Sequence, residues 1–301
     1  MDHSWGKPGE NHQATYRRGA KVRLSKLTWE DAVRWYRAQP NNEAEIRNNY
    51  FDLPVRAAAE RYAQSEEFAK VIQLLGEGNG RRILDLGAGN GIASYALARH
   101  GWNVTALEPE ESDEVGAGAI EHLASETGLK IKVVKHFGEE MPFADETFAA
   151  IHARQVLHHA NNLENMVREL YRVLDHNGWL LSTREHVVDN NEQLKAFLKE
   201  HPLHALYGGE NAYALDRYLN AFTSAGFQVV RSWGPLESVL NFYPGTEAER
   251  KVAIRQVAMH SWLRLGRLFA WSETFRARQV AAHTRRDQTP GRIHSFLTKK
   301  P

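Results

Sequence analysis

Two acidic residues and three glycines form the part of this chain best suited to binding a nucleotide-like ligand. Asp85 precedes the turn that holds Gly87, Gly89 and Gly91, and Glu108 follows about 20 residues after the first glycine. Glycines adopt positive φ and let a ligand approach the backbone without a Cβ in the way. A carboxylate at this separation binds ribose hydroxyls in doubly wound nucleotide sites. The pattern therefore predicts a ligand that contains ribose.

The spacing of the glycines narrows the choice of nucleotide. A dinucleotide fingerprint, Gly-x-Gly-x-x-Gly, needs glycine at position 92, where this chain has Ile92. No Gly-Lys-Ser/Thr follows the turn, so a triphosphate loop is not expected. Asp85 would repel a pyrophosphate but suits a ligand that carries a positive charge. An NAD-dependent oxidoreductase is consequently a disfavoured alternative.

The run Asp-Leu-Gly-Ala-Gly-Asn-Gly at 85–91, with Glu108 after it, closely resembles two motifs of a known family. These are the first two motifs of the class I S-adenosylmethionine-dependent methyltransferases, of the methyltransferase type 11 kind. The resemblance covers about 82–234 and the last strand. It implies S-adenosyl-L-methionine as the cofactor, with the loop around its methionine and ribose parts and the acid on both ribose hydroxyls.

The segment Phe-Gly-Glu-Glu-Met-Pro-Phe-Ala-Asp-Glu-Thr-Phe at 137–148 resembles a further segment of the same family and departs from it twice. Phe137 stands where an aspartate usually accepts from the adenine amino group, and Ala149 stands where another aspartate usually follows. Phe137 either stacks on the adenine or packs under the loop, and the Gly138 amide still serves the ring nitrogens. The expected cofactor-binding residues are Asp85, Gly87, Gly89, Gly91, Glu108, Phe137, Gly138, Glu139 and Arg154.

Histidines follow the expected fourth and fifth strands, whose ends face the transferring methyl group in the family that the chain resembles. A hydroxyl acceptor often needs a base with a pKa near the operating pH, and histidine fits. His158 is the preferred candidate and His159 and His186 are the others, while capping or packing roles stay open for one or two of them. No carboxylate–histidine spacing of a zinc helix is present, so no metal is predicted.

Basic residues indicate how the acceptor is held. Arg154 and Arg184 lie at the expected strand ends, and residues 250–286 carry nine Lys or Arg against one acid, Glu273. This excess predicts either a mouth for an anionic acceptor, such as a phosphate- or carboxylate-bearing metabolite, or a solvated helix face. We expect Arg154, Arg184 and Tyr50 to contact the substrate.

The elements that position these residues alternate between strands and helices from residue 82 onward. They predict an α/β fold, and the resemblance implies a Rossmann-like, seven-stranded, mostly parallel sheet with helices on both faces. The expected parts are an N-terminal helical cap at 1–78, acting as lid or brace, a cofactor-binding core at 79–244, a helical insertion or lid at 245–288 and a last core strand at 289–301.

Composition limits the class of protein. The 301 residues carry 38 Lys or Arg and 37 Asp or Glu, so no global field indicates nucleic acid as a partner. The absence of cysteine excludes disulfides and thiolate sites and suits a reducing cytoplasm. No apolar run of the roughly 18 residues needed to span a membrane is present, which leaves peripheral membrane contact open.

These observations together predict a cytoplasmic, S-adenosyl-L-methionine-dependent methyltransferase that acts on a small-molecule acceptor. The favoured reaction is O-methylation of an anionic metabolite or of a lipid-linked sugar. The alternatives are N- or C-methylation of a small molecule, and a cofactor-binding scaffold without catalysis, which the departures at Phe137 and Ala149 permit.

Overall fold

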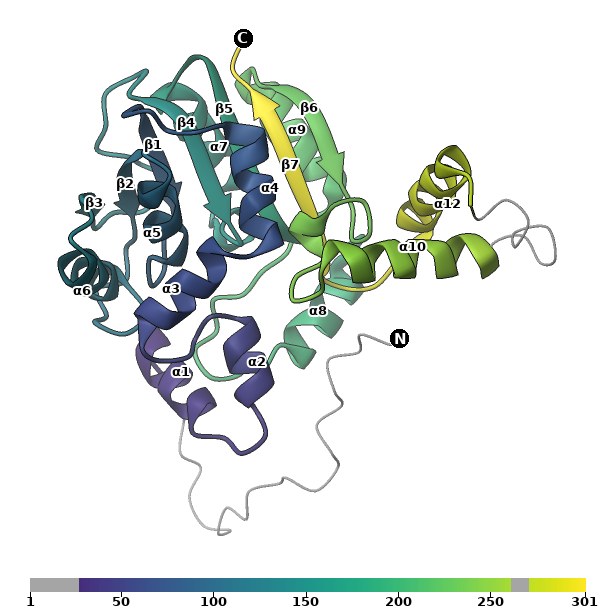
Figure 1. The fold of residues 1–301 in the computed structure, drawn as a ribbon, viewed down its shortest axis with the longest axis horizontal. Coiled ribbons are helices and arrows are strands. Elements are labelled where there is room, and N and C mark those ends of the chain that lie inside the picture. Colours follow the sequence, from purple (N-terminus) through teal and green to yellow (C-terminus); the bar gives the residue numbers. More distant parts are fainter. Residues whose placement is uncertain (1–26, 261–270) are drawn as a thin grey trace.

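The order and direction of the strands define the architecture. A computed structural model describes residues 27–260 and 271–301, and in these residues one sheet runs in the order β3-β2-β1-β4-β5-β7-β6. β1 to β5 pair in parallel, whereas β7 runs antiparallel to both β5 and β6 (Figure 1). The strands are β1 (Arg82–Leu86), β2 (Asn103–Leu107), β3 (Ile131–Val134), β4 (Phe148–Arg154), β5 (Leu174–Val187), β6 (Gln228–Trp233) and β7 (Arg292–Lys299). The predicted seven-stranded, mostly parallel sheet is confirmed.

Helices cover both faces of the sheet and bury an apolar cluster on each. One cluster contains Leu170 of α7 and Phe222 of α9, and the other contains Tyr62, Val71 and Leu97 from α3, α4 and α5. The helices are α1 (Trp29–Arg37), α2 (Glu43–Asn48), α3 (Val55–Ala63), α4 (Glu66–Leu75), α5 (Ile92–Arg99), α6 (Ala117–Thr127), α7 (Leu163–Val173), α8 (Asn191–Glu200), α9 (Leu215–Ala225), α10 (Glu247–His260) and α12 (Glu273–Arg286), with the 3₁₀ turns η1 (Leu157–His159) and η2 (Val239–Asn241).

The first two helices, α1 and α2, form a cap beyond the end of the sheet where β4 ends (Figure 1). Ala32, Tyr36, Ile46 and Leu203 make a small apolar cluster that joins α1 and α2 to the segment after α8. The cap is therefore fixed to the core through residues near position 203 as well as through its own chain.

Local capping sets the bounds of two helices. The Ser65 side chain accepts from the Phe68 amide and caps α4, so α3 and α4 are separate helices. α7 ends at Val173, since Leu174 already adopts extended backbone and begins β5.

The helices α10 and α12 lie between β6 and β7 in the chain and project away from the sheet (Figure 1). Two of the basic residues in this stretch, Arg264 and Arg267, and the segment 1–26 lie outside the described residues. None of the helices described in 27–260 and 271–301 is both long and apolar enough to span a membrane.

Candidate functional site

A cavity of about 470 Å³ lies at the carboxyl ends of β1, β2, β4 and β5, under the N-terminal cap. Parallel α/β sheets bind their ligands at this edge. The predicted site residues that line the cavity are Asp85, Gly87, Gly89, Glu108, Phe137, Gly138, Glu139, Arg154, His158, His159, Arg184 and His186. Gly91 and Tyr50 are the predicted residues that do not line it.

The glycine loop after β1 needs each of its glycines for a different reason. All three adopt positive φ, at 57° for Gly87, 55° for Gly89 and 86° for Gly91. A Cβ at Gly87 would lie 2.7 Å from a methyl group of Val156, and Gly91 begins α5 as its N-cap. A Cβ at Gly89 would meet nothing within 4 Å, so this glycine leaves its side of the loop open to a ligand.

Glu108, at the end of β2, is held by the loop that it faces. Its Oε2 accepts from the Gly89 amide at 2.7 Å, and its Oε1 accepts from the Glu110 amide at 2.9 Å. Burial raises the pKa of Glu108, and the two amide donors oppose this shift. Each carboxylate oxygen retains acceptor capacity, so the group can still receive two hydroxyls from the cavity.

Asp85 is fixed by side chains rather than left free for a ligand. Its Oδ2 accepts from the Ser94 hydroxyl at 2.6 Å, and Nδ1 of His152 lies 3.3 Å from its Oδ1. The side chain is buried, yet it lines the cavity. Asp85 therefore supplies negative charge beneath the glycine loop from one fixed position.

The segment after β3 forms the opposite wall of the cavity. Phe137 lines it with 63% of its surface exposed, which places the ring where a flat ligand could stack on it. A Cβ at Gly138 would lie 3.0 Å from Leu86 and 3.1 Å from Met166, so the backbone packs closely there. Glu139 accepts from the Asn161 amide at 2.9 Å, which ties this wall to the loop before α7.

Arg154 ends β4 in a buried ion pair that the sequence did not reveal. Its Nε lies 2.7 Å from Oε1 of Glu67, on α4, and its guanidinium lies over the rings of Tyr50 and Tyr62. Burial opposes the charged form, but Glu67 outweighs it and raises the pKa of Arg154. Tyr50 is itself fully buried, so it packs against Arg154 behind the cavity wall.

The guanidinium of Arg184 is buried, lines the cavity and has few hydrogen-bond partners. It is 8% exposed, and its Nη1 donates to the Tyr243 carbonyl at 3.3 Å. Nε has no hydrogen-bond partner, and no ion pair involves Arg184 within residues 27–260 and 271–301. Burial lowers its pKa.

An irregular backbone at Arg184 directs its side chain toward the cavity. Its φ is 62°, an uncommon value for a residue other than glycine, and the β5–β7 register shifts between Ser182 and Glu185. Such a bulge redirects a side chain relative to a regular strand. Gln155, which also lines the cavity, has φ 57°. Uncommon backbone conformations of this kind concentrate at ligand-binding sites.

The three predicted histidines come together, and each has Nδ1 tied to an acceptor. Nδ1 of His158 lies 2.7 Å from the Glu185 carboxylate, that of His159 lies 2.9 Å from the Gly209 carbonyl, and that of His186 lies 2.8 Å from the Gly291 carbonyl. Burial lowers the pKa of His158 well below its usual range and that of His186 to about 3. Their Nε2 atoms are thus available as acceptors.

His201 and Glu210 also line the cavity near these histidines, and the sequence analysis did not predict them. Nε2 of His158, His159 and His201 each lie 3.8 to 3.9 Å from a Glu210 carboxylate oxygen. Burial opposes ionisation of Glu210, but His159 and His201 outweigh it and lower its pKa to about 2. His201 and Glu210 belong to the irregular segment after α8, where the only sequence signals were a His-Pro pair and two adjacent glycines.

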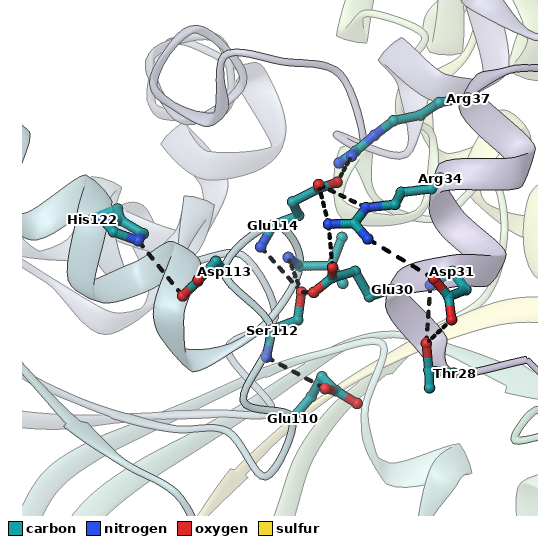
Figure 2. Close-up of polar contacts among 11 residues, drawn as sticks. Thr28, Glu30, Asp31, Arg34, Arg37, Glu110, Ser112, Asp113, Glu114 and His122 are labelled. Atoms are coloured by element: carbon teal, nitrogen blue, oxygen red, sulfur yellow. Dashed lines mark hydrogen bonds and ion pairs between the residues drawn. The ribbon is translucent and has the colours of Figure 1, made fainter.

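The cap is tied to the loop that follows Glu108 by a set of charged contacts (Figure 2). Glu114 of that loop binds Arg34 at 2.8 Å and Arg37 at 2.6 Å, both from α1, and Ser112 donates to Glu30. The cap also contributes lining residues to the cavity. They are Trp29, Tyr36, Asn49 and Phe51.

The basic residues of α10 and α12 do not take part in this cavity. No residue from these two helices, as far as the chain is described, belongs to the cavity lining. The two predicted basic groups that do line it are Arg154, paired with Glu67, and Arg184.

Comparison with known families gives a match over the sheet core. Residues 84–182 match the family model Methyltransf_11, described as a methyltransferase domain. This range begins within β1 and ends within β5, so it holds the glycine loop, Glu108 and the two histidines of η1.

Similar curated proteins include two kinds of methyltransferase. A sterol 24-C-methyltransferase of Gibberella zeae is 28% identical over 187 residues, which cover 56% of this chain and 47% of that protein. A ubiquinone biosynthesis O-methyltransferase of Rickettsia conorii is 31% identical over 96 residues, which cover 32% of each chain. The chain thus spans about half, or less, of the length of these relatives.

Solved structures show the same fold at low identity. The geranyl diphosphate C-methyltransferase of Streptomyces coelicolor, solved with Mg²⁺, geranyl diphosphate and S-adenosyl-L-homocysteine, superposes with a TM-score of 0.56 at 13% identity. The match covers 90% of this chain and 97% of that one. The [4+2]-cyclase SpnF superposes with a TM-score of 0.52 at 20% identity, over 82% of each chain.

Proposed function

Residues 84–182 form a methyltransferase type 11 domain of the class I S-adenosylmethionine-dependent methyltransferases, and from that premise we propose that the chain methylates a small-molecule acceptor. One observation carries the proposal. The glycine loop with Glu108 and the polar group formed by Arg184 and His158 line the same cavity, so a cofactor and an acceptor have adjoining places.

The residues of the cavity fit S-adenosyl-L-methionine. Gly89 leaves open space where a side chain would stand, and Glu108 is oriented by two amides with capacity for two ribose hydroxyls. Phe137 and Gly138 would receive the adenine, and Asp85 supplies negative charge on the side of the loop where the cofactor's positive groups would lie. When bound, the cofactor supplies a methyl group on a sulfonium, which is transferred by in-line displacement.

Arg184 supports an anionic acceptor. Within the described residues it is a buried guanidinium without an ion-pair partner, and a guanidinium binds two oxygens of a phosphate or carboxylate at once. Holding the acceptor by such a group aligns its nucleophile with the methyl group, and alignment supplies much of the rate in a displacement. A phosphate- or carboxylate-bearing metabolite or a lipid-linked sugar phosphate fits this requirement.

The histidines favour oxygen as the methylated atom. Two similar proteins are named for transfer to carbon in sterols and for O-methylation in ubiquinone biosynthesis. A hydroxyl nucleophile must lose a proton during transfer, and Nε2 of His158, which lines the cavity while Nδ1 is bound by Glu185, can accept it. His159 and His186 are placed similarly.

A cofactor-binding protein without methyl transfer is the second candidate, because a [4+2]-cyclase shares the fold. The test combines calorimetry with S-adenosyl-L-methionine and metabolite profiling with methyl-labelled cofactor in cells with and without the gene. We expect a labelled acidic small molecule that requires the gene. His158→Ala should lower its formation by about 10²- to 10⁴-fold with cofactor binding intact. Cofactor binding without any gene-dependent label would favour the second candidate.

A further inference from the structure

Three side chains converge where η1 meets the segment that follows α8. Nε2 of His158 and Nε2 of His159 lie 3.9 and 3.8 Å from the same oxygen of Glu210, its Oε2. One potential ligand atom from each of the three residues lies within 4.8 Å of the other two. His201 approaches the second oxygen, with its Nε2 3.9 Å from Oε1 of Glu210. Imidazoles and a carboxylate are the side chains that bind divalent transition metals.

These distances are too long for hydrogen bonds and suit an ion between the groups. An imidazole nitrogen bonded to a carboxylate would lie about 2.7–3.2 Å away. Two ligands about 2.1 Å from a tetrahedral metal lie about 3.4 Å apart, so the distances from Glu210 to His158 and to His159 exceed the spacing of a bound pair by about half an ångström.

The opposite edge of each imidazole has the partner that metal sites provide. A ligating histidine donates its second ring N–H to a carboxylate or a carbonyl, which fixes the ring and its tautomer. Nδ1 of His158 lies 2.7 Å from Oε2 of Glu185, and Nδ1 of His159 lies 2.9 Å from the Gly209 carbonyl. Since the Gly209 carbonyl only accepts, Nδ1 of His159 carries the proton and Nε2 is directed toward Glu210.

We propose that His158, His159 and Glu210 bind one divalent first-row transition metal ion, with His201 as a further ligand. A set of imidazoles and one carboxylate suits Zn²⁺, Mn²⁺ or Fe²⁺ better than Mg²⁺ or Ca²⁺, which prefer oxygen. Both His158 and His159 line the cavity, so a coordination position left open by the protein would face the acceptor.

The binding of the ion does not require methyl transfer, whereas its use in catalysis rests on the proposed function. An acceptor hydroxyl bound to the ion loses its proton to solvent more readily than a free one. Its oxygen then forms the bond to the methyl carbon as the carbon–sulfur bond breaks and that electron pair passes to sulfur. Since the ion would occupy Nε2 of His158 and of His159, the metal-bound protein would activate the hydroxyl through the ion, whereas the metal-free protein would use Nε2 of His158 as the base, as proposed above.

Calorimetric titration of the EDTA-treated full chain with Zn²⁺ tests the site. The chain has no cysteine, so thiolates do not compete for the metal. We expect one equivalent to bind the wild type, and His159→Ala and Glu210→Gln each to weaken binding at least about 10-fold. Glu185→Gln, which removes the acceptor from Nδ1 of His158, should weaken it by about 10- to 100-fold.

His176→Ala is the matched control, because its exposed imidazole likewise faces a carboxylate, Glu146 at 2.9 Å, but does not belong to the proposed metal site. It should bind zinc like the wild type. Absence of a stoichiometric site, or equal affinity in wild type and His159→Ala, would overturn the proposal. Parallel titration with S-adenosyl-L-methionine separates the two claims, since zinc binding without cofactor binding rejects the proposed function alone. Cofactor binding without zinc binding rejects the metal site alone.

Discussion

Replacing Glu108 by alanine tests how the glycine loop and the second strand bind the cofactor. The Glu108 carboxylate is 7% exposed and already accepts from the amides of Gly89 and Glu110. In the proposed complex it also accepts from the ribose hydroxyls. Glu108→Ala therefore removes the ribose contacts and leaves two loop amides without their carboxylate.

The size of the effect follows from these contacts. Hydrogen bonds to a charged group contribute about 1.5–3 kcal/mol each, but water from the cavity replaces part of what is lost at an open site. We expect Glu108→Ala to weaken S-adenosyl-L-methionine binding by about 1–3 kcal/mol in total. That range corresponds to an increase in Kd of about 5- to 150-fold.

Isothermal titration calorimetry measures this Kd directly. Glu111→Ala is the matched control, because Glu111 lies in the same loop, is exposed and does not line the cavity. Glu108→Gln keeps the shape and one carbonyl acceptor, so it should fall between the wild type and Glu108→Ala. An unchanged Kd in Glu108→Ala, measured on a folded protein, would refute the assignment of Glu108 to the cofactor site.

Three further predictions concern the loop, the acceptor and pH. Gly87→Ala should lower the free energy of unfolding in urea by about 1–3 kcal/mol, because the added Cβ would contact Val156. Gly89→Ala should lower it less but should weaken cofactor binding. A larger loss of stability in Gly89→Ala than in Gly87→Ala would contradict this. Arg184→Gln should raise the KM for the profiled acceptor about tenfold or more without changing cofactor Kd, and wild-type KM should rise with salt. Burial raises the pKa of Glu108, so its contribution to the free energy of unfolding is present at low pH and is lost as pH rises through that pKa. Cofactor affinity should increase over the same pH interval, because the ionised carboxylate binds the ribose. Glu108→Gln should flatten the pH dependence of both the free energy of unfolding and the cofactor Kd.

The glycine loop and the fold could be predicted because their determinants are local in sequence. Glycine at positions of positive φ and a carboxylate at the end of the next strand are readable from spacing alone. The period of apolar residues likewise predicted the order of strands and helices, and the family that the core resembles predicted a seven-stranded, mostly parallel sheet.

Contacts between distant segments could not be predicted in the same way. The Glu67 partner of Arg154 lies 87 residues earlier in the chain, and nothing in the sequence pairs the two. The irregular segment that brings Glu210 to His159 has no periodicity that would place it. The left-handed backbone of Arg184 arises from the β5–β7 bulge, which depends on a strand more than 100 residues later. The Glu67–Arg154 pair, the position of Glu210 and the backbone of Arg184 depend on tertiary packing, so only the structure reveals them.

The most direct measurement of the central claim is transfer of a labelled methyl group from S-adenosyl-L-methionine to the small-molecule fraction of the cells, catalysed by the purified full chain. The proposed function predicts a labelled acidic product with the wild type and a yield lowered by Glu108→Ala at limiting cofactor. A purified, folded chain that binds the cofactor and yields no labelled small molecule in any such extract would contradict it.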